Sequence, residues 1–206
     1  MADFWTRYRR NRAAVMGLGI LLTILIMAAT AHLFYPEDPF RLVGRPLSGP
    51  LENGFLLGSD SLGRDVASGI VHGAKTSLLI GLIATLVSIF IGIFFGAFAG
   101  YFGGRIDDLL MRITEIFQTI PSFIFAILLV AIMKPSIVSI VIAIAVVSWP
   151  GVARLVRGEF LSLKNREFVQ ACHTLGMGDF RVMMKEILPN CLSPIIVIGS
   201  LMVATA

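Results

Sequence analysis

The sequence predicts an all-α integral membrane protein that crosses the bilayer several times. Hydrophobic residues make up 56% of its 206 residues and charged residues only 15%, whereas soluble domains carry roughly 25% charged residues. The mean hydropathy is +0.86. Five apolar runs alternate with polar segments, and a helix needs ~20 apolar residues to span a bilayer. We therefore interpret the net charge of +4 as a topology signal and not as a nucleic-acid-binding surface.

The first apolar run, residues 13–34, is long enough for a membrane-spanning helix. A short basic segment precedes it, with Arg7, Arg9, Arg10 and Arg12. Because basic residues are retained in the cytoplasm, we expect a cytoplasmic N-terminus and an outward-running first helix. Residues 29–31 are small, as at a signal-peptide cleavage site, but the run is longer than a signal core. We therefore expect this helix to remain uncleaved.

Residues 35–75 form a long polar stretch that is expected to lie outside the cell. Its first half is rich in proline and glycine, which predicts irregular structure. In its second half, Asp60 is expected to cap a short helix over residues 61–72. The simplest role for Arg64 and Asp65 is an exposed ion pair.

The second apolar run, residues 76–102, carries glycines at four-residue intervals, at Gly92, Gly96 and Gly100. Small residues at this spacing let two helices approach closely in lipid. We expect these glycines to lie at a helix–helix contact. A turn at residues 101–108 follows and is expected on the cytoplasmic side.

The third run, residues 109–133, is expected to form one helix that is kinked at Pro121, since proline removes a backbone hydrogen bond. Glu115 has two interpretations. It could pair at the membrane interface with Arg112, which is also within reach of Asp108. Alternatively, it could belong to a transport pathway, because carboxylates at membrane depth are costly and often functional.

The fourth run, residues 137–155, is expected to return to the cytoplasm, with an interfacial aromatic residue and a bend at residues 149–151. The fifth run, residues 191–206, reaches only part-way across a ~30 Å hydrocarbon core at ~1.5 Å per residue. With this topology, twelve of the 17 lysines and arginines fall on the cytoplasmic side and five outside. That asymmetry agrees with the positive-inside rule.

Residues 165–194, between the last two runs, form the one long charged, amphipathic segment. Its first apolar residues recur at helical spacing and share one face of a short helix. They are Phe168, Ala171, Cys172 and Leu175. Gly176 then predicts a tight turn at the end of this helix, because glycine reaches positive φ at low cost.

A second short helix is expected to begin at Asp179, which is suited to an N-cap. Its apolar stripe comprises Phe180, Met183, Met184, Ile187 and Leu188. Pro189 predicts a break or kink after this stripe. The segment is therefore a pair of short helices joined by a glycine turn. An ordinary helical hairpin and a DNA-binding helix-turn-helix share this pattern, but membrane segments on both sides disfavour the second.

The sequence contains no recognisable metal, nucleotide or catalytic site. Its two cysteines and three histidines are Cys172, Cys191, His32, His72 and His173. They have neither metal-ligand spacing nor a disulfide pattern. Residues 69–76 contain glycines and a Lys-Thr pair but lack the spacing of a phosphate-binding loop. We therefore expect no enzymatic activity and no cofactor bound by the chain itself.

Four stretches resemble the permeases of oligopeptide/dipeptide (peptide/nickel) ATP-binding-cassette importers. Residues 165–194 are similar to the EAA loop of that family, with Gln170-Ala171-Cys172, then Gly176, then Ile187-Leu188-Pro189. Gln170 and Cys172 replace the acid and the second alanine of the family pattern. The other stretches are residues 57–65, with L-G-x-D-x-x-G-R-D, residues 99–107, with A-G-Y-x-G-G-x-x-D, and residues 147–158.

The resemblance implies the C-type membrane subunit of a type-1 importer. Residues 1–75 would hold the cytoplasmic N-terminus, the first helix and an external segment. Residues 76–206 would form the permease domain, with a cytoplasmic coupling loop at 157–189. Within it, ATPase coupling is implied for Gln170, Ala171, Gly176, Ile187, Leu188 and Pro189.

The resemblance also implies the partners of such a subunit. They are a second, homologous permease, two cytoplasmic ATP-binding subunits that use the ATP, and a periplasmic or external solute-binding protein. The substrate would be a peptide and the location the bacterial inner membrane. Family members usually continue beyond the fifth apolar run, so a C-terminally truncated chain is expected. An ion-coupled carrier or channel subunit is the alternative from another class.

Overall fold

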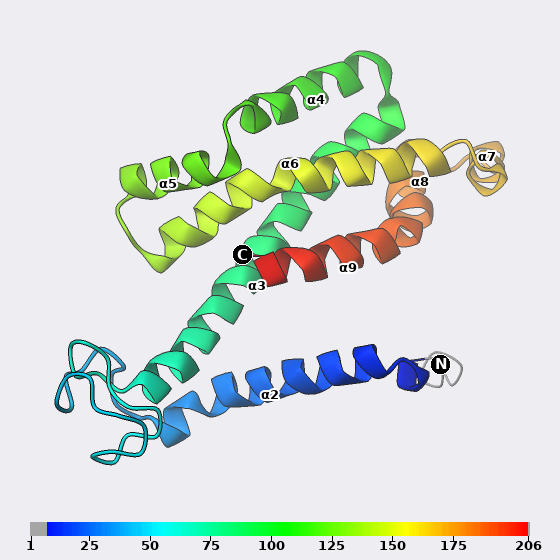
Figure 1. Ribbon diagram of the computed structural model, residues 1–206. Helices are drawn as coiled ribbons and strands as arrows, with labels where there is room; N and C mark the ends of the chain where they lie inside the picture. The colour runs from blue at the N-terminus through cyan, green and yellow to red at the C-terminus, as the bar shows by residue number, and fades with distance from the viewer. Residues whose placement is uncertain (1–7, 206) are drawn as a thin grey trace. The chain divides into compact units, whose positions relative to one another are not determined.

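The computed structural model describes residues 8–205, and its regular structure within that range is helical (Figure 1). Arg7, one of the basic residues expected in the cytoplasm, lies outside the described residues. The helices are α2 (Arg12–Phe34), α3 (Val66–Phe102), α4 (Gly104–Thr119), α5 (Ser122–Met133), α6 (Ile137–Leu163), α7 (Glu167–Thr174), α8 (Asp179–Val182), the π-helical segment η1 (Met183–Ile187) and α9 (Leu188–Thr205). Among the described residues, four spans are long and apolar enough to cross a membrane, or five if α4 and α5 count as one. The predicted all-α, polytopic membrane fold is confirmed.

The chain divides into two compact units, Met1–Leu79 and Ile80–Ala206. In the first unit, α2 begins after Asn11, whose side chain accepts a hydrogen bond from the backbone N–H of Ala14. Such a cap satisfies one of the free amides at a helix start.

The irregular segment after α2 is closed by a turn around Asp60. Its Oδ1 accepts hydrogen bonds from the backbone amides of Leu62 at 2.8 Å and Arg64 at 2.9 Å. These bonds, first the one from Arg64, lower the pKa of the Asp60 carboxyl. Asp60 therefore organises a turn and does not cap a helix.

The helix expected over residues 61–72 instead begins at Val66, so that prediction was wrong in its start. Asp65 takes the capping role, because its Oδ1 accepts from the backbone N–H of Ala67 at 2.8 Å. From Val66 the helix α3 continues without a break to Phe102. The expected Arg64–Asp65 ion pair is not among the described contacts, and the Arg64 guanidinium lies 5.5 Å from the centre of the Phe40 ring.

In the second unit, three glycines of α3 face α6. A Cβ added at Gly92 would lie 2.5 Å from Cβ of Val152, and one added at Gly100 would lie 2.6 Å from Cβ of Phe160. Gly96, between them, faces the backbone of α6 in the same way. Hydrogen at these positions is what allows the two helices to approach so closely.

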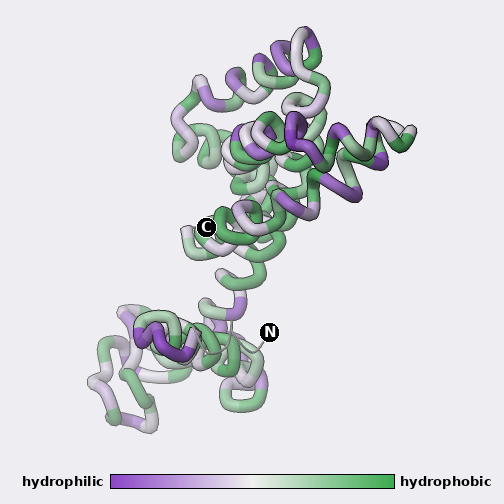
Figure 2. Tube along the Cα trace, turned by 90° about the vertical axis from the view of Figure 1, so that its right-hand side faces the viewer, coloured by the Kyte–Doolittle hydropathy of each residue, from purple (hydrophilic) through white to green (hydrophobic). Residues whose placement is uncertain are grey.

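The third apolar run is broken and not merely kinked. The axes of α4 and α5 differ in direction by 83°, and Ile120 leaves the helical region with φ −90° and ψ 132°. Pro121 explains the break, since it lacks an N–H and disfavours helical geometry in the preceding residue. The part before the break, α4, begins at Gly104 and carries alternating hydrophilic and hydrophobic residues (top of Figure 2).

Both later boundaries also differ from the prediction. α6 extends to Leu163, beyond the expected end at residue 155, because Pro150 is accommodated inside it. Of the break or kink expected at Pro189, the break is absent, since α8, η1 and α9 form one continuous span, Asp179–Thr205. The π-helical turn η1 explains this, because the wider turn gives the Pro189 ring room beside the preceding carbonyls.

Gly96→Ala is expected to destabilise the permease by about 1–3 kcal/mol, because the added methyl group meets the backbone of α6. Gly158→Ala is the matched control, since its Cβ would meet nothing within 4 Å and alanine is the better helix former. Thermal unfolding of the purified protein in detergent measures both. Equal unfolding temperatures for the two variants would contradict the close approach of α3 and α6.

The Asp60 turn is expected to loosen in acid. Because its folded pKa is lowered, the stabilising contribution is present above the ordinary value of about 3.9 and is lost as pH falls through the folded pKa. Hydrogen exchange of the Leu62 and Arg64 amides, relative to the same amides in Asp60→Asn, measures this. An unchanged ratio as the pH falls from 6 to well below the ordinary pKa of the carboxyl, where Asp60 is protonated, would show that the carboxylate does not hold the turn.

Candidate functional site

The turn between α7 and α8 is a complete Schellman motif. Gly176 has φ +80°, its N–H donates to the carbonyl of His173 at 2.9 Å, and the N–H of Met177 donates to the carbonyl of Cys172 at 3.0 Å. Met177 and Cys172, the positions that make a hydrophobic contact in many such motifs, both pack against the apolar core. The turn is therefore a defined structure held by backbone bonds. We call residues 167–187 the coupling hairpin, after the expected coupling loop, residues 157–189, within which they lie.

The coupling hairpin is anchored to the bundle by one buried side. Val169, Val182, Met183 and Ile187 are at most 1% exposed, and they form a core cluster with Val156 and Phe160 of α6. The same buried stripe continues into α9 through Cys191 and Ile195. The hairpin, the end of α6 and the start of α9 therefore share one apolar core.

The opposite side of the hairpin leaves large apolar side chains in the open. Leu175 is 81% exposed and Phe180 is 67% exposed. Met184 and Phe168 are less exposed, at 42% and 38%. The apolar stripes recognised in the sequence are thus divided between two surfaces. Met183 and Ile187 are buried against the bundle, whereas Phe180 and Met184 are exposed.

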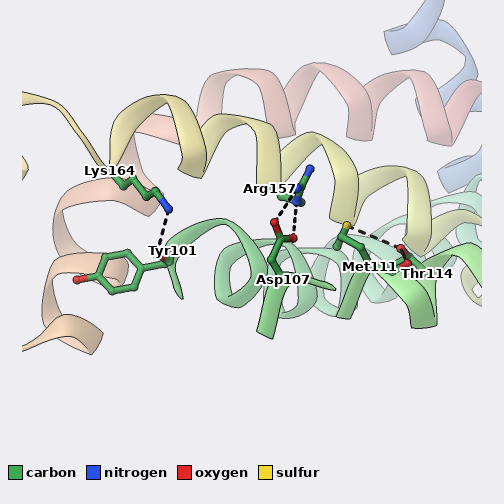
Figure 3. A network of polar contacts seen from close by, with 6 residues as sticks. All are labelled: Tyr101, Asp107, Met111, Thr114, Arg157 and Lys164. Carbon is green, nitrogen blue, oxygen red and sulfur yellow. Dashed lines mark hydrogen bonds and ion pairs between the residues drawn. The ribbon is translucent and has the colours of Figure 1, made fainter. Parts of the chain in front are cut away.

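Tyr101, at the end of α3, ties that helix to both halves of the hairpin. Its hydroxyl donates to Asp179 Oδ1 at 2.7 Å and lies 3.2 Å from Nε2 of His173. The single hydroxyl proton is used on Asp179, so His173 Nε2 carries the hydrogen that the Tyr101 oxygen accepts. The Lys164 ammonium also donates to the Tyr101 carbonyl at 3.5 Å (Figure 3).

Asp179 was expected to be the N-cap of α8, and that prediction was wrong. Gly178 occupies the cap with extended backbone, and Asp179 is the first helical residue. Its carboxylate is instead directed to Tyr101. An acid in the first turn still interacts favourably with the helix dipole.

A second polar tie joins α4 to α6. Arg157 donates from Nε and Nη2 to the two carboxylate oxygens of Asp107, at 2.5 and 2.6 Å (Figure 3). Bidentate pairs of this kind fix orientation as well as distance. The expected pairing of Arg112 with Asp108 or Glu115 is not among the ion pairs of the described residues. Those residues line an open polar hollow between α4 and α6.

The residues singled out for coupling occupy three kinds of place. Gln170 and Ala171 lie on the exposed side of α7, where the Gln170 amide donates to the carbonyl of Asn165 at 3.3 Å. Gly176 forms the turn. Ile187 is buried, and Leu188 and Pro189 are the first residues of α9, directly after the hairpin.

Sequence reasoning did not assign the partners of Tyr101, Asp107 or Arg157. The stretch A-G-Y-x-G-G-x-x-D contains Tyr101 and Asp107, and its similarity to the family pattern was the signal in the sequence that marked these two residues. Their partners lie about 50 to 80 residues away along the chain, so no local pattern could reveal them. Among the described residues, no group of histidine, cysteine and acidic side chains is arranged to hold a metal ion.

Comparison with known proteins identifies two matching family models. Residues 92–206 match the binding-protein-dependent transport system inner membrane component, and residues 1–48 match the N-terminal TM domain of oligopeptide transport permease C.

The similarity to curated proteins extends over the whole chain. This chain is 39% identical to the di/tripeptide transport system permease protein DppC of Pseudomonas aeruginosa, over 100% of this chain and 70% of that protein. The dipeptide permease DppC of Escherichia coli K12 is 42% identical, over 98% of this chain and 69% of that protein. The oligopeptide permease OppC of Bacillus subtilis is 36% identical, over 99% of this chain and 67% of that protein.

Tyr101→Phe is expected to lower the free energy of unfolding by about 0.5–1.5 kcal/mol, because it removes the hydroxyl shared by Asp179 and His173. In a double-mutant cycle, Tyr101→Phe and Asp179→Ala should be non-additive, since they remove the same bond. Asp179→Asn keeps an acceptor oxygen and should cost less. Tyr35→Phe is the control, because its hydroxyl has no partner among the described residues. Strict additivity of the cycle would refute the tie.

Proposed function

The chain belongs to the family of binding-protein-dependent transport system inner membrane components, and from this membership we propose that it is a permease subunit of an ATP-driven peptide importer. The similar proteins are transport permeases and not enzymes. Their printed names specify dipeptides, tripeptides or oligopeptides, which supports the peptide class. The chain is a multi-pass membrane protein, and we place its N-terminus in the cytoplasm.

In this proposal the chain forms half of the translocation pathway. A homologous permease forms the other half, a periplasmic or external solute-binding protein delivers the peptide, and two cytoplasmic ATP-binding subunits supply the energy. ATP is used by those subunits, and no cofactor is assigned to this chain. The coupling hairpin then faces the cytoplasm, where the positive-inside rule puts its basic flanks.

The observation that carries the proposal is the two-sided burial of the hairpin. One side is buried in the core of the bundle, and the other presents Leu175 and Phe180 to the surroundings. Polar and charged residues flank these side chains, which makes lipid an unsuitable environment for them. Exposed apolar residues with a polar rim are typical of a protein-binding surface. The ATP-binding subunit is the partner proposed for it.

The division of the hairpin assigns each coupling residue a task. Gln170 and Ala171, on the exposed side of α7, would contact the ATP-binding subunit. Gly176 would hold the angle between α7 and α8. Ile187, Leu188 and Pro189 would pass displacement of the hairpin to α9.

The proposed mechanism is alternating access driven from the hairpin. Because the hairpin shares a core with α6 and α9 and is tied to α3 through Tyr101, it would move these spans as a unit. Closely packed elements shift between discrete arrangements and do not deform continuously. ATP would therefore favour one side of access by its differential affinity for the two arrangements.

Gly176→Val is expected to leave the subunit in the membrane but to uncouple ATP hydrolysis from peptide uptake. A β-branched residue at φ +80° costs roughly 1–2 kcal/mol locally and changes the angle of the hairpin. The assay is peptide uptake and ATP hydrolysis by the complete importer in proteoliposomes. Gly178→Val is the matched control, since Gly178 also has open space around it but an extended backbone with φ −69°. Normal uptake by Gly176→Val would remove the coupling role of the turn.

A further inference from the structure

A hollow of about 240 Å³ lies where the third apolar run is broken. Four spans contribute to it, namely α3, α5, α6 and α9, and its polar lining consists of hydroxyl groups. These belong to Thr85, Ser122, Ser148 and Thr205. Phe123 and Met202 are among its apolar lining residues. We call it the hydroxyl hollow.

The hollow lies near the middle of the membrane. Ser148 is separated from the outer end of α6 at Ile137 by about 16 Å, at ~1.5 Å per residue. This is about half of the ~30 Å hydrocarbon core. Polar groups at this depth are costly unless they have partners.

Free backbone donors border the hollow. α5 is 12 residues long and begins at Ser122, and its N-cap, Pro121, provides no side-chain hydrogen bond. The first backbone bond into the helix is from the N–H of Phe125 to the carbonyl of Pro121. The amides of the preceding residues, 122–124, therefore have no partner within the helix, and such amides favour an anionic group.

Thr85 gives independent evidence for a ligand. Its side chain is only 4% exposed and lines the hollow, yet its hydroxyl makes no hydrogen bond among the described residues. Elsewhere in α3, Thr76 and Ser88 donate to carbonyls of their own helix, at 3.1 and 2.8 Å. An unbonded hydroxyl on a nearly buried side chain that lines the hollow is a donor available to a molecule there.

We propose that the hydroxyl hollow binds the free carboxylate of the translocated peptide, with Thr85, Ser148 and the N-terminus of α5 as hydrogen-bond donors. Its lining contains no carboxylate and no basic side chain. Hydroxyl and amide donors at a positive helix end suit an anion and disfavour an ammonium group. The volume admits one end of a peptide, so the rest of the substrate extends into the pathway. This inference rests on the proposed function.

The test uses the complete importer in proteoliposomes, with saturating solute-binding protein. Uptake of alanyl-alanine is compared with uptake of its C-terminal amide, for the parent and for Thr85→Val and Ser148→Ala. Thr76→Val is the control, because the Thr76 hydroxyl is bonded within its own helix and lies outside the hollow. The solute-binding protein is the same in every assay, so its own preference cancels when each variant is compared with the parent.

In the double variant that combines Thr85→Val and Ser148→Ala, we expect the uptake rate of the free acid to be roughly tenfold lower than in the parent. The rate for the amide and the stimulated ATP hydrolysis should stay within about twofold of the parent. Equal loss for acid and amide would show a structural role only, and no loss would show that the hollow is not used; either overturns the carboxylate site. A parent that takes up neither these two compounds nor any longer peptide would instead overturn the proposed function.

Discussion

The buried contact between the π-helical turn and the end of α6 is the interaction on which the rest of the second unit depends. Met183 and Ile187 pack there against Val156 and Phe160. The contact requires α6 to reach Phe160, and the helix continues to Leu163, a length of 27 residues against the ~20 that span a bilayer. It makes the coupling hairpin part of the bundle, so we expect displacement of the hairpin to be accompanied by displacement of α6 and α9.

Two further features connect this body to the remaining spans. The glycines of α3 bring its backbone against α6, and the ties from Tyr101 and Asp107 fix the ends of α3 and α4 to the hairpin and to α6. These ties are polar and partly exposed, so each contributes modestly to stability. They matter mainly for orientation, because a bidentate pair and a shared hydroxyl fix how the joined helices are oriented relative to each other.

Sequence reasoning succeeded where one physical rule dominates and failed where two compete. Apolar run length located the spans, and four-residue spacing of Gly92, Gly96 and Gly100 suggested a close helix contact. Proline was less predictable: Pro121 breaks its helix, Pro150 is tolerated, and a π-turn accommodates Pro189. Neighbouring packing decides among these outcomes. Likewise, helical spacing grouped Phe180 with Met183, but only the tertiary contact shows that one is exposed and the other buried.

The central claim is that the exposed side of the coupling hairpin contacts the ATP-binding subunit. Leu175→Cys places a reactive thiol at its most exposed apolar position, 81% accessible, and Ile132→Cys, 72% accessible on α5, is the matched control. Both variants also carry Cys172→Ser, because the native Cys172 is a free, half-buried thiol in the same hairpin. With a short bifunctional reagent in the assembled importer, Leu175→Cys should cross-link to the ATP-binding subunit in a nucleotide-dependent manner, and Ile132→Cys should not. Absence of that product, or an equal yield from both positions, would contradict the account.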